Sequence, residues 1–96
     1  MNNSPTQPAL GDTLKERGSR YGAFDGHANI AQRLKNVMQN SPSWVNCSPS
    51  QKEALDMIQH KIARILNGDP NYADSWHDIS GYATLVEKQL ANLDVK

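Results

Sequence analysis

The sequence predicts an all-α fold, and three observations lead to this class. Apolar residues recur at helical spacing in three stretches, and no stretch alternates apolar and polar residues as a strand does. Start and stop signals flank the most regular stretches, as at Ser48-Pro49 and at 67–70 (NGDP). A break of about five residues makes the last two stretches antiparallel. We expect an antiparallel helical hairpin over about 50–67 and 73–92, with a shorter third helix over about 28–39.

The N-terminal part of the chain is predicted to be irregular. Residues 1–12 are polar, contain proline and lack periodicity, which indicates a flexible arm before a single helical domain over 13–96. Gly18, Gly22 and Gly26 then recur at four-residue spacing, which disfavours a long helix. We therefore expect a short helical turn ending near Gly18, followed by a loop.

Each expected helix has an apolar stripe. Both Ser48-Pro49 and Ser50-x-x-Glu53 fit the start of the first hairpin helix, and Asn71 or Asp74 could cap the second. In the linker before the hairpin, Trp44 and Val45 are expected to pack on the core. The third helix places Ile30, Leu34, Val37 and Met38 on one face; the hairpin stripes are Ala54, Leu55, Ile58, Ile62, Ile65 and Leu66, and Ile79, Tyr82, Ala83, Val86, Leu90 and Leu93.

Composition limits the classes of function. The 96 residues (10.7 kDa) are 38% hydrophobic, which makes a thin core, so we expect a homo-oligomer. Ten basic residues balance ten acidic ones without a basic run, which excludes an electrostatic grip on duplex nucleic acid. The single Cys47 excludes an intramolecular disulfide. Without an apolar membrane span or a signal peptide, we expect a cytoplasmic protein with no membrane partner.

Residues 17–22 (RGSRYG) are the strongest candidate for a ligand site. Arg17 and Arg20 offer bidentate donors to phosphate, Tyr21 offers a stacking ring, and the glycines let a ligand approach the backbone. The spacing is not that of a P-loop. The structural alternative is a loop in which Tyr21 and Phe24 pack on the hairpin and the arginines are exposed.

Charged side chains on the flanks of the hairpin allow two interpretations. At about 100° per residue, Lys61, Arg64 and Asp78 lie beside their stripes, on flanks that meet in an antiparallel pair. They could form an interhelical ion pair that sets the register. They could instead form a basic wall that binds phosphate oxygens, with Asp78 holding one cation in place.

Aromatic residues of the last helix could stack on a base. Trp76 lies at the edge of the stripe and Tyr82 lies within it. Gly81 in mid-helix costs about 1 kcal/mol relative to alanine, so it should mark a close helix contact, within the fold or between subunits. The alternative is that Gly81 leaves room for a ligand beside Tyr82.

Four acidic residues provide an alternative, enzymatic interpretation. Glu53, Asp56, Asp74 and Asp78 have a spacing that could hold Mg²⁺ between facing helices. However, Glu53 lies roughly 160° and Asp56 roughly 140° from the centre of their stripe, so both are expected to face solvent. His27, His60 and His77 share no metal-ligand spacing.

Four segments resemble a family of short phage and prophage proteins. They are R-Y-G (20–22), E-A-L-D-M-I (53–58), K-I-A-R-I-L-N-G-D-P (61–70) and D-S-W-H-D-I-S-G-Y-A (74–83). The two-helix pattern is more distantly similar to MazG-type all-α nucleotide pyrophosphohydrolases, whose acidic motifs align only with Glu53, Asp56, Asp74 and Asp78. The resemblance to phage proteins implies a small accessory protein that disables a host function, such as a helical oligomer that sequesters a nucleotide immune signal.

The leading expectation is therefore a binding protein without a cofactor or a catalytic residue. It would hold a nucleotide or cyclic nucleotide in a site that subunits could share, within the host cytoplasm if the gene is phage-encoded. A Mg²⁺-dependent nucleoside triphosphate pyrophosphohydrolase is the first alternative, and a protein-binding inhibitor of a host protein is the second. The expected ligand-binding residues are Arg17, Arg20, Tyr21, Lys61, Arg64, Trp76, Asp78 and Tyr82.

Overall fold

The computed structural model describes residues 10–95, which form four α-helices and one 3₁₀ turn. No strand occurs in residues 10–95, so the all-α prediction is confirmed. Within this range no helix is long and apolar enough to cross a membrane. The elements are α1 (Leu10–Tyr21), α2 (Phe24–Gln39), η1 (Trp44–Asn46), α3 (Pro49–Asn67) and α4 (Ala73–Val95).

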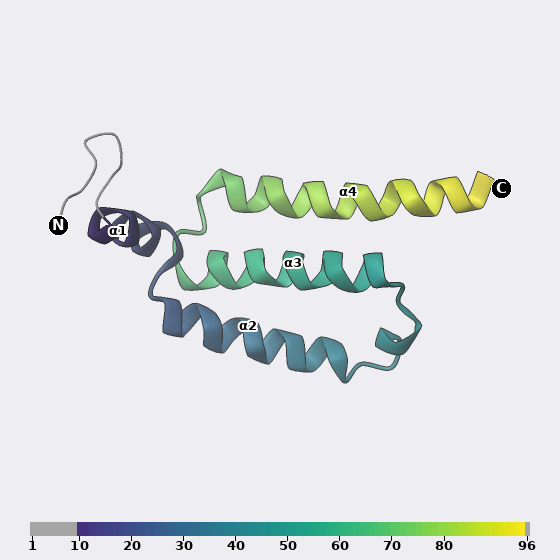
Figure 1. Ribbon diagram of the computed structural model, residues 1–96, viewed down its shortest axis with the longest axis horizontal. Coiled ribbons are helices and arrows are strands. Elements are labelled where there is room, and N and C mark those ends of the chain that lie inside the picture. The colour runs from purple at the N-terminus through teal and green to yellow at the C-terminus, as the bar shows by residue number, and fades with distance from the viewer. Residues whose placement is uncertain (1–9, 96) are drawn as a thin grey trace.

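Three of the helices form a single layer. Figure 1 shows α2, α3 and α4 side by side, with α3 in the middle and each neighbour antiparallel to it. The hairpin expected over 50–67 and 73–92 is therefore α3 with α4. Helix α1 lies at the end of the layer where α2 begins and α3 ends. Because α3 separates α2 from α4, the layer has two broad faces.

The prediction for the N-terminal part of the domain is wrong in three respects. Helix α1 continues through Gly18 to Tyr21, and α2 begins at Phe24 and contains Gly26. Residues 10–12, expected in the flexible arm, belong to α1, while residues 1–9 lie outside the described residues. A helical glycine costs about 1 kcal/mol, and the packing of α1 on α2 and α3 outweighs that cost.

Helix α3 begins with a capping box at Ser48. The backbone N–H of Gln51 donates to Ser48 Oγ (3.1 Å), and the backbone N–H of Ser48 donates to Gln51 Oε1 (2.8 Å). Pro49 occupies the first helical position, where its missing N–H costs nothing. Of the two predicted starts, Ser48-Pro49 is therefore confirmed and Ser50-x-x-Glu53 is wrong.

The core of the described chain is small. Its buried apolar residues are Ala31, Ala54, Ala63 and Ile65, and among residues 10–95 no large side chain is fully buried. Ala54 and Ala63 lie about 180° apart around α3, because the middle helix packs on both sides. The prediction of one apolar stripe facing the core is therefore only partly right.

The linker and the overall shape agree with an open structure. Val45 is 77% exposed, so the expectation that it packs on the core is wrong. Trp44 is half-buried, with Lys52 Nζ 5.6 Å from the centre of its ring. The radius of gyration is 17.0 Å, against about 12.5 Å for a compact domain of this length.

Candidate functional site

Two segments more than forty residues apart are joined at the end of the layer by hydrogen bonds to backbone carbonyl groups. Asn67 Nδ2 donates hydrogen bonds to the carbonyl oxygens of Tyr21 (2.7 Å) and Ala23 (2.9 Å). The backbone N–H of Asp69 donates to the carbonyl oxygen of Arg20 (2.7 Å). We call this contact between residues 20–23 and 67–69 the clasp. It ties the end of α1 to the end of α3.

Glycine is required at two positions of the clasp. Gly22 has φ 78°, in the left-handed region, and its N–H donates to the carbonyl oxygen of Gly18 (2.9 Å) to end α1. A Cβ at Gly22 would overlap the backbone oxygen of Asn67, and one at Gly68 would overlap that of Arg20. The R-Y-G and N-G-D-P segments therefore meet backbone against backbone.

The clasp holds three arginines and two tyrosines around one pocket of about 250 Å³. The Arg20 guanidinium carbon lies 4.3 Å from the centre of the Tyr72 ring, and that of Arg64 lies 4.2 Å from the centre of the Tyr21 ring. The two rings meet edge to face at 6.1 Å. Arg17 and Thr13 complete the lining. We call this the arginine pocket.

The arginine pocket has the chemistry of an anion site. Among the lining residues whose side chains the structure describes, none is acidic. The guanidinium of Arg64 uses its face for the contact with the Tyr21 ring, so its N–H edge can still form the bidentate hydrogen bonds that phosphate favours. The site thus offers positive charge in a concave, aromatic setting.

Sequence reasoning missed two pocket residues, Thr13 and, more importantly for the chemistry of the site, Tyr72. Tyr72 lies in the short connection between α3 and α4, and its Oη donates a hydrogen bond to Asp74 Oδ2 (3.0 Å). That hydrogen bond raises the pKa of Tyr72. One signal was available in the sequence. The chain has three tyrosines, and Tyr72 stands two positions after Pro70 of the N-G-D-P stop, where a turn brings it back toward residues 17–22.

A second recess of about 420 Å³ adjoins the arginine pocket and shares Arg17, Tyr21 and Arg64 with it. Its other walls include Leu14 (59% exposed) and Phe24 (77% exposed). Such exposure leaves the apolar walls open to a ligand. The expectation that Phe24 packs on the hairpin is wrong for the same reason.

Two histidines line this recess without adding charge at neutral pH. The rings of His27 and His60 meet edge to face at 4.6 Å. Burial, and then the nearby Arg64, lower both pKa values, that of His60 to about 4. His27 Nδ1 is buried without a hydrogen-bond partner. The recess is therefore a largely neutral surface beside the arginines.

Lys61 and Asp78 lie away from the arginine pocket. Lys61 Nζ is 3.0 Å from Asp78 Oδ2, between α3 and α4. This is the interhelical pair that the flanking positions allowed. Of the basic wall, only Arg64 reaches the pocket that Arg17 and Arg20 line.

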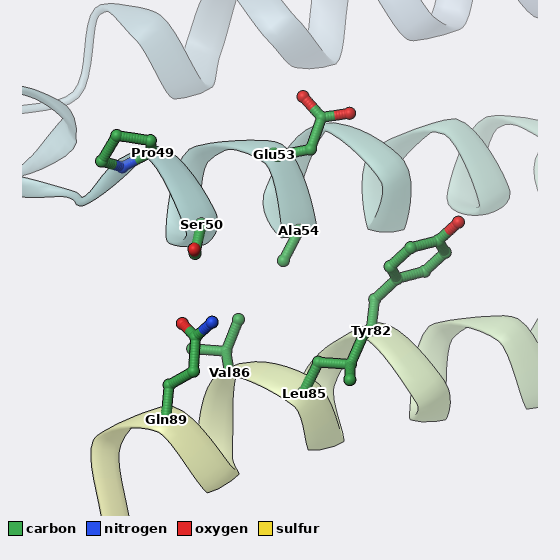
Figure 2. A pocket seen from close by; sticks show the side chains of 8 residues that line it. All are labelled: Pro49, Ser50, Glu53, Ala54, Tyr82, Leu85, Val86 and Gln89. Carbon is green, nitrogen blue, oxygen red and sulfur yellow. The ribbon is translucent and has the colours of Figure 1, made fainter. Parts of the chain in front are cut away.

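Trp76 and Tyr82 also lie elsewhere. The Trp76 Nε1–H donates to the carbonyl oxygen of Pro70 (2.9 Å). Tyr82 lines a groove of about 400 Å³ between α3 and α4, where Ala54 points toward α4 and Glu53 points away from it (Figure 2). No atom of the described residues lies within 4 Å of a Cβ built at Gly81, so the expected contact within the fold is not present.

The four acidic residues of the enzymatic alternative are dispersed. Asp74 accepts the Tyr72 hydroxyl, Asp78 pairs with Lys61, and Glu53 is exposed in the α3–α4 groove. Asp56 is half-buried, with Oδ1 enclosed, so the expectation that it faces solvent is wrong. Among the side chains that the structure describes, no three His, Cys, Asp or Glu residues are grouped closely enough to hold a metal ion.

Comparison with known proteins adds one finding. Residues 9–90 match the sequence profile of a domain of unknown function, DUF6378. This range covers all the residues that line the arginine pocket and the clasp. No curated protein and no solved structure matches the chain.

Proposed function

Because this chain belongs to the DUF6378 family, a domain of unknown function, we propose its role from the geometry of its own site. It binds and sequesters a phosphate-bearing small molecule without hydrolysing it. The observation that carries the proposal is the arginine pocket, in which Arg17, Arg20 and Arg64 line one concavity with two tyrosines. Three arginine side chains around one concavity favour an anion of high charge density.

The adjoining recess favours a nucleotide over a bare phosphate. A ligand whose phosphate lies against Arg17 and Arg64 would extend a ring toward Phe24 and His60, since both pockets share these arginines. Aromatic and apolar walls stack with any base, because every base has a π-face. Pockets of about 250 and 420 Å³ are together of the size that small-molecule sites have, roughly 300–1,000 Å³.

The biological role within this proposal follows from the resemblance to short phage proteins. A protein that holds a nucleotide or cyclic nucleotide immune signal would act in counter-defence, in the cytoplasm of the host cell. A single chain lines the arginine pocket, so the proposal does not require a site shared between subunits.

Calorimetric titration and thermal shift test the proposal. The purified chain is mixed with inorganic phosphate, nucleoside mono- and triphosphates, and cyclic di- and trinucleotides, each with and without Mg²⁺. A ligand at 100 times its Kd stabilises the fold by about 2.7 kcal/mol, which raises the Tm by about 10 °C or more. Chromatography of the mixture afterwards should return the ligand intact.

The other outcomes decide between the alternatives. Loss of a nucleoside triphosphate that requires Mg²⁺ would replace sequestration with pyrophosphohydrolysis. Absence of binding to every phosphate compound would refute the proposal and favour a protein-binding inhibitor.

Paired substitutions locate the site. Arg64→Gln removes a cation from the arginine pocket and should weaken binding by about 10- to 100-fold, as expected for lost charge-assisted hydrogen bonds. Arg17→Gln should act in the same direction. Arg33→Gln, on an exposed position of α2 outside both pockets, is the matched control and should leave affinity unchanged. If all three variants bind equally well, the ligand lies elsewhere.

A further inference from the structure

The two grooves between α3 and α4 distinguish the two broad faces of the layer. Glu53 and Leu85 line the groove shown in Figure 2. Leu55 and Ala83 line a second groove, of about 360 Å³. On α3, Leu55 is about 160° from Glu53, so the two grooves open on opposite faces.

One of these faces is apolar along α3. Leu55, Ile62 and Leu66 fall within an arc of about 40° around the helix. The centre of this arc is about 140° from His60 and about 180° from Arg64, which line the recess described above. The arginine pocket and the leucines of α3 therefore belong to opposite faces. We call the face with Leu55, Ile62 and Leu66 the apolar face.

Helix α4 continues the apolar face on one side. Ala83 lines the groove on this face, and Trp76 and Leu90 lie within about 20° of Ala83 around α4. Two acidic residues of α4 lie on or beside this arc: Glu87 lies about 40° from Ala83, toward the outer edge of the layer, and Asp94 falls at about 20° from Ala83 in the last turn of the helix.

Helix α2 continues the apolar face on the other side. Ile30 and Val37 lie about 120–140° from Phe24, which lines the recess on the arginine side. The buried residues of α2 are His27 and Ala31. Met38 falls between these two around the helix, so part of the α2 stripe packs toward α3, whereas Ile30 and Val37 lie about 80–100° from that direction, toward the apolar face.

The apolar face exposes a large apolar surface. Leu66 is 66% exposed, Val37 64%, Trp76 55%, Leu90 43% and Leu55 39%. If a large side chain has on the order of 200 Å² of accessible surface, these five alone expose roughly 500 Å². The half-buried Ile30, Leu34, Ile58 and Ile62 add to this area. A stable interface needs about 800 Å² per partner, which this face approaches from its apolar residues alone.

We infer that the apolar face packs against the same face of a second copy, which gives a two-layer homodimer with six layer helices. The small core is the reason for choosing this occupant. Among residues 10–95 only three alanines and Ile65 are buried apolar residues, so a partner that covers the apolar face would add substantially to the stability of the fold. A second copy is always available, and a predominantly apolar face can pack on itself about a two-fold axis.

This inference does not depend on the proposed ligand. The arginine pocket lies on the other side of α3, so dimerisation through the apolar face leaves it open. A monomeric variant that retains its fold should therefore still bind whatever ligand the wild-type chain binds.

Sedimentation equilibrium of the full chain tests the inference. The wild-type protein should have about twice the chain mass of 10.7 kDa, and its Tm should rise with protein concentration. Leu66→Glu places a carboxylate in the interface and should weaken the dimer by about 100-fold or more. The matched control is Leu85→Glu, because Leu85 is 63% exposed but lies on the opposite face. This control should remain dimeric.

Two results would overturn the inference. The first is a wild-type chain that is monomeric, with a Tm independent of concentration. The second is dissociation by Leu85→Glu that equals or exceeds dissociation by Leu66→Glu. If Leu66→Glu does not fold, as judged by circular dichroism, Val37→Glu serves instead, because Val37 is 64% exposed on α2. The concentration dependence of the wild-type Tm needs no variant.

Discussion

Replacing Gly22 with alanine should destabilise the protein by disrupting the clasp. An L-residue in the left-handed region costs about 1–2 kcal/mol. The added Cβ would also overlap the backbone oxygen of Asn67, which cannot rotate away as a side chain would. The reduced entropy of the unfolded chain offsets about 0.4–1 kcal/mol. We expect a net loss of about 2 kcal/mol or more, since the overlap must be relieved by separating α1 from α3.

The other glycines of the chain provide the controls. Gly81→Ala should stabilise the protein by about 1 kcal/mol, because no atom among the described residues crowds its Cβ and alanine is the better helix former. The two alanine variants should therefore differ by about 3 kcal/mol, or about 12 °C or more in Tm. Gly22→Asn separates the two causes. Asparagine tolerates the left-handed region but keeps the overlap with Asn67, so it should remain clearly destabilised.

Thermal and urea unfolding followed by circular dichroism measure these differences. The reasoning would be refuted if Gly22→Ala unfolded within 2 °C of the wild-type protein, a shift worth about 0.5 kcal/mol or less. A Gly22→Ala variant that folds but binds phosphate compounds more weakly would connect the clasp to the arginine pocket, because Arg20 and Tyr21 precede Gly22 directly.

Two further predictions concern charge. Lys61→Met should change the free energy of unfolding by about 1 kcal/mol or less, because the carboxylate of Asp78 that remains is 43% exposed to water. Asp78→Asn should lower the free energy of unfolding by more, because the ammonium of Lys61 that remains is only 12% exposed and has lost its partner. Urea unfolding that ranks Lys61→Met as the more damaging change would contradict this asymmetry. Because the pKa of His60 is lowered from 6.5 to about 4, the unfolded chain binds a proton between these pH values and the folded chain does not. The stabilising contribution of neutral His60 is therefore complete above about pH 6.5 and is lost as the pH falls toward 4. His60→Gln should flatten this decline in the free energy of unfolding, measured at a series of pH values. An unchanged slope would exclude His60 as the source of the decline.

The glycine pattern of the N-terminal region shows why local reasoning misjudged that part of the fold. Three glycines at four-residue spacing disfavour a helix when each is considered by its own propensity. The structure places Gly18 and Gly26 inside helices and only Gly22 between them. What distinguishes Gly22 is the carbonyl of Asn67, 45 positions away, and propensity carries no information about such a neighbour.

The candidate site was predictable in part. The arginines and the tyrosine of residues 17–22 were identified because their chemistry is concentrated in six positions. Arg64 was placed on the correct flank of its helix, but it was grouped with Lys61, which binds Asp78 instead. Tyr72 was missed because its contribution depends on how the α3–α4 turn folds back over Arg20.

The sequence by itself determined the all-α class and the existence of α2, α3 and α4, because periodicity acts over a few residues, but it left open whether α3 starts at Ser48-Pro49 or at Ser50-x-x-Glu53. Only the tertiary structure decided which side of each helix is covered. Each stripe was expected to face the core, yet α2 packs through His27 and Ala31, and α3 packs on both sides. The physical reason is that an apolar stripe indicates which side of a helix favours burial, but it does not indicate which other element covers that side. In this chain part of each of the three stripes packs between neighbouring helices, and the rest lies on the same uncovered face.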